Sequence, residues 1–465
     1  MLFVLLIKKE IEFPAEILKQ LKTLTGFDEK TFLDSQKSEA VNSVRINPSK
    51  WMGNEHSGEV IPWCNDGLYL SHRPEYIKDP FYHAGHYYVQ EASSMFVGSL
   101  VDFYLPKKEN LTVLDLCAAP GGKSTHILSL LNDSSILISN EISYKRVPIL
   151  EENITRWGRS NVIVTNNSPS DFSTLTNFFD LILVDAPCSG SGLFRKMPEH
   201  LENWDCSYVR ESAKRQKEIL SEIASSLKPN GILIYSTCSF SKEENEEIVQ
   251  WLIKEKNFSE ENFNQKVTAD IIKTGPGSFR FFPGKINGEG FFVSVLRKPT
   301  ESNSGEINYK PRKVNDFIRR LSQNEKSTLK KWTLSNDLLG HYKSSEFFIF
   351  PEERWEDLSW LENKLKIRKK GVKVGELKGN DFSPAHDLSL SNYLNDEIPQ
   401  VNFSERNFFS YLNRNTLEPV NSTSKGFFVV TFKNARQGWA KNIGSRVNNY
   451  FPKEWRVIKN LNEFL

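Results

Sequence analysis

Five runs of apolar residues, separated by helical stretches, constrain the fold of this 465-residue chain more than any other feature. The runs are rich in leucine and β-branched residues, and they lie at 111–116, 136–140, 161–165, 179–185 and 231–236. Strands that are apolar throughout and alternate with helices are typical of a parallel sheet with both faces covered. The sequence therefore predicts a doubly wound α/β sheet.

The remaining sequence divides into further segments around this sheet. At about 150 residues per domain, the length predicts roughly three domains. Helical and short-strand patterns precede the sheet, a late strand is predicted at 290–296, and a polar stretch follows at 300–305. We predict four segments: a small N-terminal α+β domain at 1–88, the sheet domain at 89–300, a linker or auxiliary region at 301–390, and a β-rich domain at 391–465.

Charge is distributed unevenly along the chain. Residues 1–300 hold 33 basic and 38 acidic side chains, whereas residues 301–465 hold 27 and 20. The overall net charge of +2 is no polyanion-binding signature, but the last third of the chain is basic. The run 364–370 is a candidate phosphate contact, and the alternative is a solvated charged surface.

Aromatic residues interrupt the basic residues near the C-terminus. Trp439, Tyr450 and Trp455 lie among them, which suits phosphate contacts combined with base stacking. The alternative is a solvated basic face around a small β core. The basic residues are Lys425, Lys433, Arg436, Lys441, Arg446, Lys453, Arg456 and Lys459.

The cysteine content favours a reducing compartment. Five cysteines, an odd number spread over a long chain, are poor material for a disulfide framework. The sequence has no close Cys/His cluster, so a structural zinc site is not expected. The apolar opening at 2–7 is too short to span a bilayer. We predict a cytoplasmic protein that needs neither a metal nor a membrane.

A glycine-containing turn follows the first apolar run. The segment LDLCAAPGGK at 114–123 lies between a strand and a helix, where doubly wound sheets bind ligands. A phosphate-binding P-loop needs glycine where this chain has Cys117, so an NTPase is not indicated. S-adenosylmethionine fits better, because Glu141 ends the next strand and can accept both ribose hydroxyls. A plain strand–helix turn is the alternative.

Two cysteines follow later strands of the same sheet. Cys188 lies in DAPCSGSG at 185–192, and Cys238 lies in YSTCS at 235–239. Both are expected at the carboxyl edge that carries the glycine turn. A cysteine more often serves as a small buried apolar residue. These two cysteines, however, are predicted in loops that face the presumed methyl donor, which favours a functional role.

Together these three motifs resemble the RNA cytosine-5 methyltransferases of the Sun (nucleolar proliferation antigen) family. The flanks are similar to the family as well: VRIN at 44–47, EASSM at 91–95, and RFFP at 280–283 with GFF at 290–292. The C-terminal pattern at 438–456 looks like the PUA-like RNA-binding extension of the bacterial 16S ribosomal RNA subgroup. The resemblance implies a Rossmann-like methyltransferase sheet and S-adenosylmethionine as cofactor.

The resemblance also implies roles for individual residues. Cys238 is the nucleophile that adds to carbon 6 of cytosine, which makes carbon 5 nucleophilic. Asp185 contacts ring N3 and the exocyclic amine, Cys188 assists departure of Cys238, and Lys123 helps to hold Cys238 as a thiolate. The implied cofactor-binding residues are Cys117, Ala118, Ala119, Pro120, Gly121, Gly122, Lys123, Glu141, Ser168 and Asp185.

The chain departs from the family pattern in two places. Where the family has an aspartate for the adenine amine, this chain has TNNS at 165–168, so that Asn167, Ser168 or Asp171 is left for that contact. A family Pro-His and Asp-Gly appear here as Pro283-Gly284 and Glu289-Gly290. These departures affect cofactor and RNA contacts rather than the cysteines.

The sequence thus predicts a monomeric RNA (cytosine-5)-methyltransferase that acts on 16S ribosomal RNA or the small ribosomal subunit. Transfer RNA is the alternative substrate. A non-catalytic RNA-binding ribosome assembly factor is the alternative class, although it has no need for Lys123, Asp185, Cys188 and Cys238 together. DNA cytosine methyltransferases place their nucleophile in the Pro-Cys loop, which corresponds here to Cys188.

Overall fold

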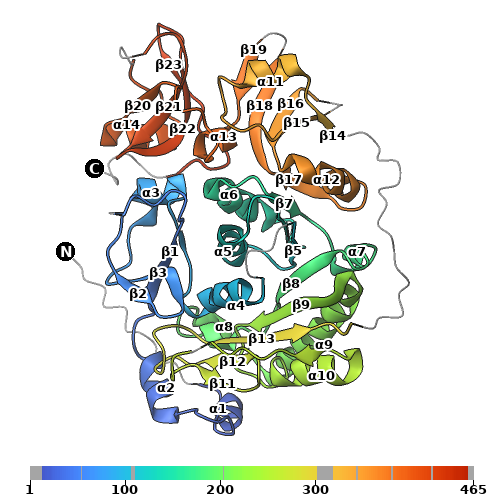
Figure 1. Cartoon of the computed structure of the whole chain (residues 1–465). Coiled ribbons are helices and arrows are strands. Elements are labelled where there is room, and N and C mark those ends of the chain that lie inside the picture. Colours follow the sequence, from blue (N-terminus) through green and yellow to red (C-terminus); the bar gives the residue numbers. More distant parts are fainter. Residues whose placement is uncertain are drawn as a thin grey trace, which may run out of the picture.

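A ten-stranded sheet forms the centre of the protein (Figure 1). The computed structural model describes residues 13–53, 55–105, 110–202, 204–265, 267–300, 318–341, 344–378, 381–419 and 423–458. The apolar opening at 2–7, the polar stretch at 301–305 and Lys459 lie outside these ranges. The five runs predicted as parallel strands are β5 (Thr112–Asp115), β6 (Ile136–Asn140), β7 (Val162–Thr165), β8 (Phe179–Asp185) and β9 (Leu227–Thr237).

The parallel strands have the order β9-β8-β5-β6-β7, so that the winding reverses between β5 and β8. In an open α/β sheet the crevice outside this switch point binds the ligand. The predicted doubly wound fold is therefore confirmed, and its geometry places the loops after β5 and β8 at the centre of the carboxyl edge.

Helices cover both faces of the sheet, which explains the continuous apolar runs. One face is buried beneath α4 (Phe96–Tyr104), α5 (Gly122–Leu130) and α6 (Val147–Trp157). The other is buried beneath α7 (Pro169–Phe172), α9 (Cys206–Ile223), α10 (Glu246–Lys256) and α12 (Trp355–Glu362). In the described part of the chain, no helix is long and apolar enough to cross a bilayer.

Antiparallel strands extend the sheet at both edges. On the β9 side, β13 (Phe291–Arg297) pairs with β9, and β12 (Ser278–Phe281) and β11 (Ile272–Lys273) follow, while β10 (Ser259–Glu260) pairs with one end of β13. On the other side, β17 (Ile367–Lys370) pairs with β7. The strand β17 and the helix α12 come from the region 301–390, so that this region contributes directly to the central sheet and its cover.

The N-terminal segment packs against the central sheet domain in two places. Its four strands, in the order β2-β3-β1-β4, are β1 (Asn42–Ile46), β2 (Glu59–Ile61), β3 (Cys64–Leu70) and β4 (Tyr87–Val89). A short helix, α3 (Pro80–Ala84), precedes β4. A further short helix, α8 (Glu199–Glu202), belongs to the sheet domain rather than to this segment. The helices α1 (Ala15–Leu21) and α2 (Glu29–Gln36) share an aromatic core with Phe194, Phe240 and Phe282.

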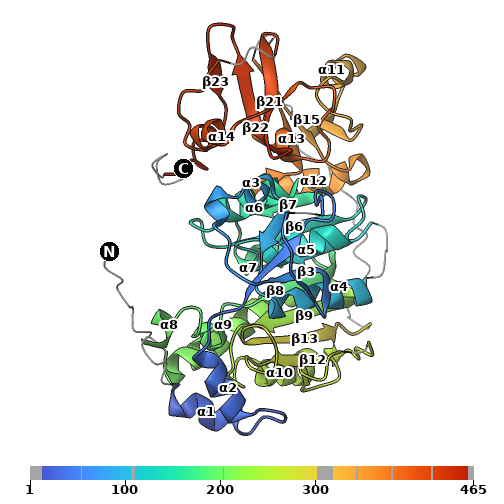
Figure 2. The same ribbon diagram turned by 90° about the vertical axis from the view of Figure 1, so that its left-hand side faces the viewer.

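Two further sheets lie beyond β7, at the top of Figure 1. The first has the order β14-β15-β16-β18-β19, and its helices are α11 (Gln323–Leu329) and α13 (His386–Leu390). Its strands are β14 (Ile318–Arg320), β15 (Leu338–His341), β16 (Glu346–Ile349), β18 (Val372–Lys378) and β19 (Asp381–Pro384). The second contains α14 (Glu405–Leu412), β20 (Gln400–Asn402), β21 (Gly426–Phe432), β22 (Ala435–Asn442) and β23 (Val447–Asn449). Figure 2 shows both stacked above the central sheet.

The C-terminal aromatic residues do not all face solvent. Trp439, predicted as a stacking residue, is 1% exposed, and its indole donates to the Ala385 carbonyl at 2.8 Å. This correction has a packing cause, because Trp439 and Val429 join the core of the preceding sheet. Tyr450 remains exposed. Trp455 is half-buried, and the His386 ring lies edge-on to the rings of both Trp455 and Phe451.

A buried arginine joins the N-terminal domain to the helix after the glycine turn. Arg45 on β1 donates to Gln90 Oε1 at 2.8 Å and to Thr125 Oγ1 at 2.6 Å, and its guanidinium lies 4.4 Å from the Trp157 ring centroid. Burial lowers the pKa of Arg45 to about 10. The strand β1 therefore holds the first turns of α5 in place.

We predict that Arg45→Met lowers the free energy of unfolding by about 3 kcal/mol, because the hydrogen bonds to Gln90, Thr125 and the Gly122 carbonyl are lost and their acceptors stay buried. Urea and thermal unfolding of the full chain would measure the change. The control is Arg210→Met, at an exposed position on α9. Equal stability of the two variants would contradict this role of Arg45.

Candidate active site

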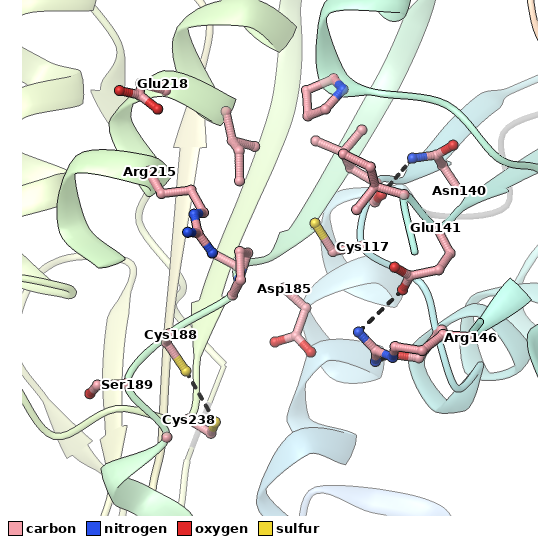
Figure 3. A pocket seen from close by; sticks show the side chains of 18 of the residues that line it. Cys117, Asn140, Glu141, Arg146, Asp185, Cys188, Ser189, Arg215, Glu218 and Cys238 are labelled. Carbon is pink, nitrogen blue, oxygen red and sulfur yellow. Dashed lines mark hydrogen bonds and ion pairs between the residues drawn. The ribbon is translucent and has the colours of Figure 1, made fainter. Parts of the chain in front are cut away.

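Two adjoining cavities lie at the carboxyl edge of the parallel strands. The larger, of about 1000 Å³, is lined by the loops after β5, β6, β8 and β9 and by one face of α9. The smaller, of about 320 Å³, lies against the glycine turn. Figure 3 shows Cys188 and Cys238 at one end of the large cavity, Glu141 with Arg146 at the other, and Asp185 between them.

The glycine turn forms a wall shared by the two cavities. Cys117 and Ala119 line both, whereas Ala118, Pro120, Gly122 and Lys123 line the smaller one. Gly121, with φ 115°, has a left-handed conformation that only glycine adopts readily, and it precedes α5. Gly121 itself lines neither cavity, so its contribution is to shape the turn.

Asp115, at the end of β5, supplies a buried carboxylate beside the smaller cavity. Its Oδ2 accepts from Ser124 Oγ at 2.7 Å, while Oδ1 is buried without a hydrogen-bond partner. Burial raises the pKa of Asp115 to about 7. An unpaired buried acceptor of this kind fits an ammonium group, such as that of the methionine part of S-adenosylmethionine.

Glu141, at the end of β6, presents a second buried carboxylate to the large cavity. Its Oε1 accepts from Ser143 N at 2.8 Å, and its Oε2 lies 3.3 Å from Arg146 but accepts no hydrogen bond. Arg146 also donates to the Ala119 carbonyl, which ties the two loops together. This geometry leaves Glu141 Oε2 available to ribose hydroxyls, so the donor set fits the nucleoside part of the cofactor.

Ser168 does not line either cavity. Its hydroxyl donates to Asp171 Oδ2 at 2.9 Å and caps α7, and Asn167 is held between Asp171 and the Lys366 amide. The neighbouring Pro169 lines the large cavity instead. The three polar residues considered for the adenine contact therefore bind one another, and the wall at this place is apolar.

The two predicted cysteines are neighbours, although 50 residues separate them. Cys188 Sγ and Cys238 Sγ lie 3.1 Å apart, and both are free thiols (Figure 3). The hydrogen bond to Cys238 raises the pKa of Cys188, and burial adds to this effect. This direction suits Cys188 to the role of hydrogen-bond donor in the contact between the two sulfurs.

Lys123 and Asp185 form an ion pair across the switch point. Lys123 Nζ donates to Asp185 Oδ2 at 2.6 Å, and Ser236 Oγ donates to Asp185 Oδ1 at 2.8 Å. Burial acts to lower the pKa of Lys123, but Asp185, with smaller contributions from Asp115 and Cys238, raises it overall. The ammonium therefore stays charged, and it stabilises negative charge on both Asp185 and Cys238.

One buried carboxylate, not predicted from the sequence, links the two cysteine loops. Glu244 accepts from Ser189 N at 2.8 Å and Ser189 Oγ at 2.6 Å, next to Cys188, and from Ser239 Oγ, next to Cys238. Gln216 on α9 donates to it at 3.2 Å. Glu244 is fully buried, so these contacts fix both loops in one arrangement.

The structure thus brings together Cys188, Cys238, Asp185, Lys123 and Glu141 as predicted. Sequence reasoning missed Asp115, Arg146 and Glu244. Asp115 carries a usable signal, since it ends a strand directly before the glycine turn, but Arg146 and Glu244 are defined only by their contacts. Among the described residues, no cluster of three or more His, Cys, Asp or Glu is placed to hold a metal.

Three protein-family models match successive parts of the chain. Residues 13–92 match the N-terminal domain of 16S rRNA methyltransferase RsmF, residues 103–297 match 16S rRNA methyltransferase RsmB/F, and residues 399–457 match the methyltransferase RsmF PUA domain. The chain is similar to ribosomal RNA small subunit methyltransferase F of Vibrio vulnificus (strain YJ016), at 30% identity over 445 residues and 92% of each chain. It is 27% identical to that of Vibrio cholerae serotype O1 (strain M66-2), over 96% of this chain and 97% of the relative.

Solved structures share the fold of the central and N-terminal parts. A methyltransferase homolog protein from Pyrococcus horikoshii has a TM-score of 0.50 and 25% identity, covering 62% of this chain and 100% of that one. NSun6 from Pyrococcus horikoshii, solved with the S-adenosylmethionine analogue SFG, has a TM-score of 0.53 and 22% identity, covering 63% and 100%. The second likeness concerns the fold alone.

The Rossmann-like sheet and the donor set at its carboxyl edge define an S-adenosylmethionine-dependent RNA methyltransferase. Its N-terminal and PUA domains flank the catalytic sheet in the order of the matched models. The chain belongs to the RsmB/F family of 16S rRNA methyltransferases, with the domain set of RsmF. The family resemblance stated from the sequence is thereby confirmed.

We predict that Glu244→Ala reduces the kcat of methyl transfer about 100-fold, because the cysteine loops lose their shared anchor and reacting groups shift. The KM for S-adenosylmethionine should stay unchanged, since Glu244 does not reach Glu141 or the glycine turn. Glu244→Gln should recover part of the loss. The control is Glu211→Ala, at an exposed position on α9. An unchanged kcat would contradict a positioning role for Glu244.

Proposed function

We propose that this protein methylates carbon 5 of a cytosine in 16S ribosomal RNA through a covalent bond between Cys238 and carbon 6. The observation that carries the proposal is the cysteine pair, with Sγ atoms 3.1 Å apart beside a buried Lys123–Asp185 ion pair. The names of the Vibrio relatives support the ribosomal RNA substrate.

In this mechanism Cys238 enters as a thiolate and its sulfur bonds to carbon 6. A proton from solvent passes through Asp185 to ring N3, so that the charge created by the addition is offset by a proton while Lys123 keeps its own. S-adenosylmethionine supplies the methyl group to carbon 5 and leaves as S-adenosylhomocysteine. The carbon-5 proton then passes to water, the Cys238–carbon 6 bond breaks, and N3 returns its proton through Asp185.

Cys188 acts at the last of these steps. Its retained proton faces the Cys238 sulfur, so it can donate a hydrogen bond to the thiolate as the sulfur leaves carbon 6. Lys123 stabilises the same negative charge from the other side. Without Cys188 the thiolate is a poorer leaving group, and the adduct should persist.

For the cofactor we propose that Asp115 binds the ammonium, Glu141 binds the ribose hydroxyls, and the 117–123 turn encloses the methionine part. Ser168 acts by capping α7 rather than by direct contact. We further propose a cytoplasmic monomer without a metal, divided at about residues 88, 300 and 390, with RNA bound by the N-terminal and PUA-like domains.

We predict that Cys238→Ala abolishes methyl transfer and adduct formation, whereas Cys188→Ala leaves a covalent RNA adduct on a denaturing gel. The assay uses labelled S-adenosylmethionine with 30S subunits, naked 16S RNA and transfer RNA, followed by nucleoside analysis. Cys206→Ala is the control, because Cys206 lies outside both cavities.

Three outcomes would change the proposal. An adduct that depends on Cys188 would reverse the cysteine roles and match the order of DNA methyltransferases. Labelled 5-methylcytosine in transfer RNA alone would replace the substrate. No label in any RNA, with cofactor binding intact, would favour a non-catalytic assembly role.

We predict that the affinity for S-adenosylmethionine rises about tenfold between pH 5.5 and 7, because an ammonium binds only ionised Asp115 and burial raises the pKa of Asp115 to about 7. Asp115→Asn should bind more weakly at pH 7 and lack this rise. Calorimetry would measure both, with Asp102→Asn, an exposed position on α4, as the control. The same rise in Asp115→Asn would exclude this carboxylate.

A further inference from the structure

An exposed basic and aromatic surface adjoins the mouth of the large cavity. We define it as the rim surface, formed by Ile142, Tyr144, Lys145, Lys364 and Lys366. We propose that the rim surface binds the RNA strand that adjoins the target nucleotide, through phosphate contacts and stacking on Tyr144. This inference rests on the proposed function and extends it to a place on the molecule that the catalytic groups do not reach.

The edge strand β17 and the residues before it supply alternating basic side chains. Lys364, Lys366 and Arg368 are exposed, whereas Leu365 is buried in the core beneath the sheet. Lys364 and Leu365 lie in the turn after α12, where both backbone N–H groups donate to the Leu361 carbonyl, and β17 begins at Ile367. The basic run noted in the sequence therefore spans this turn and the edge strand.

Tyr144 lies next to two of these cations, Lys366 and Arg368, and remains open to solvent. Its side chain is 63% exposed, and Lys366 Nζ and Arg368 Cζ lie 5.7 Å and 5.5 Å from its ring centroid. A large exposed ring flanked by cations suits stacking on a nucleobase while the cations meet the adjoining phosphates. Such an arrangement would bind a strand without reading its sequence, because every base has a face that can stack.

Hydrogen bonds hold the rim surface beside the cavity. Asn166 Nδ2 donates to the Glu141 carbonyl at 2.7 Å and the Ile142 carbonyl at 3.0 Å, and Asn166 N donates to the Lys366 carbonyl at 3.0 Å. Ile142, 62% exposed, lines the large cavity itself. The rim surface is thus continuous with the site that holds the cysteines.

The rim lysines differ from the cations just beyond them. In the groove between α6, β17 and the C-terminal domain, each cation has a carboxylate partner: Arg368 with Glu151, Lys369 with Asp387, Lys370 with Glu362, and Lys373 with Glu346. Within the described ranges, Lys145, Lys364 and Lys366 have no such ion pair. Between the groove and the rim surface, it is therefore the rim surface that presents cations without an acidic partner, and these attract phosphates.

The position of the rim surface fits a strand that runs between two parts of the enzyme. Tyr144 follows β6, so it lies at the same carboxyl edge of the sheet as Cys188 and Cys238. In Figure 1, β7 and β17 form the edge of the central sheet that is nearest to the C-terminal domains. An RNA that contacts the C-terminal domain and the cysteines together passes this edge.

The test is a steady-state comparison of wild-type enzyme, Tyr144→Ala and the double variant Lys364→Gln/Lys366→Gln on naked 16S RNA and on 30S subunits. We expect a rise of at least about fivefold in the KM for RNA in both variants, with kcat within about twofold and an unchanged Kd for S-adenosylmethionine. In the double variant, the slope of log affinity against log salt should fall by about 2, one for each lysine that no longer neutralises a phosphate. Lys19→Gln/Lys254→Gln, at exposed positions on α1 and α10, is the control.

The outcomes separate this inference from the proposed function. A wild-type enzyme that methylates none of the RNAs defeats the proposed function before the variants are compared. An active wild type whose rim variants keep its KM and salt slope overturns the inference. A changed Kd for the cofactor, or an effect on 30S subunits that is absent with naked RNA, also overturns it, since the rim would then serve the cofactor or a ribosomal protein.

Discussion

The Lys123–Asp185 ion pair joins the two halves of the sheet at the point where its winding reverses. Lys123 comes from the turn after β5 and Asp185 from the end of β8, and their 2.6 Å contact lies between the glycine turn and the cysteines. Because Asp185 keeps Lys123 charged despite burial, the site has a fixed cation beside Cys238. The cofactor turn and the cysteine loops therefore act as one site.

Parts of the chain outside the sheet hold this arrangement in place. Arg45 of the N-terminal domain anchors the helix after the glycine turn. Glu244 anchors both cysteine loops from within the sheet domain. At the other edge, β17 closes the sheet beside β7 and brings Lys366 next to the loop after β6. The loops of the catalytic edge are thus supported by the buried contacts of Arg45 and Glu244 and by the pairing of β17 with β7.

Most site residues predicted from the sequence lie at the end of a parallel strand or in the motif that follows it. The cofactor-turn residue Cys117 and the catalytic candidates Asp185, Cys188 and Cys238 were predictable for this reason, since parallel strands bring their carboxyl ends to one edge whatever the intervening length. Ser168 was predicted to contact the cofactor because it lies where the family has an aspartate. In the structure its hydroxyl caps a helix instead. Trp439 was predicted to stack on bases because basic residues surround it in the sequence. Its side chain is buried, because it packs between two sheets.

The sequence by itself determined the alternation of strands and helices, the order of the catalytic motifs and the edge at which they meet. These follow from hydrophobic periodicity and turn chemistry, which are local properties of the chain. Only the tertiary structure decided which cysteine has a raised pKa, which carboxylate oxygens accept no hydrogen bond, and which lysines lack an acidic partner. Those properties depend on burial and on contacts between residues far apart in sequence, such as the Asn167–Lys366 hydrogen bond, which spans 199 positions, and no local pattern records them.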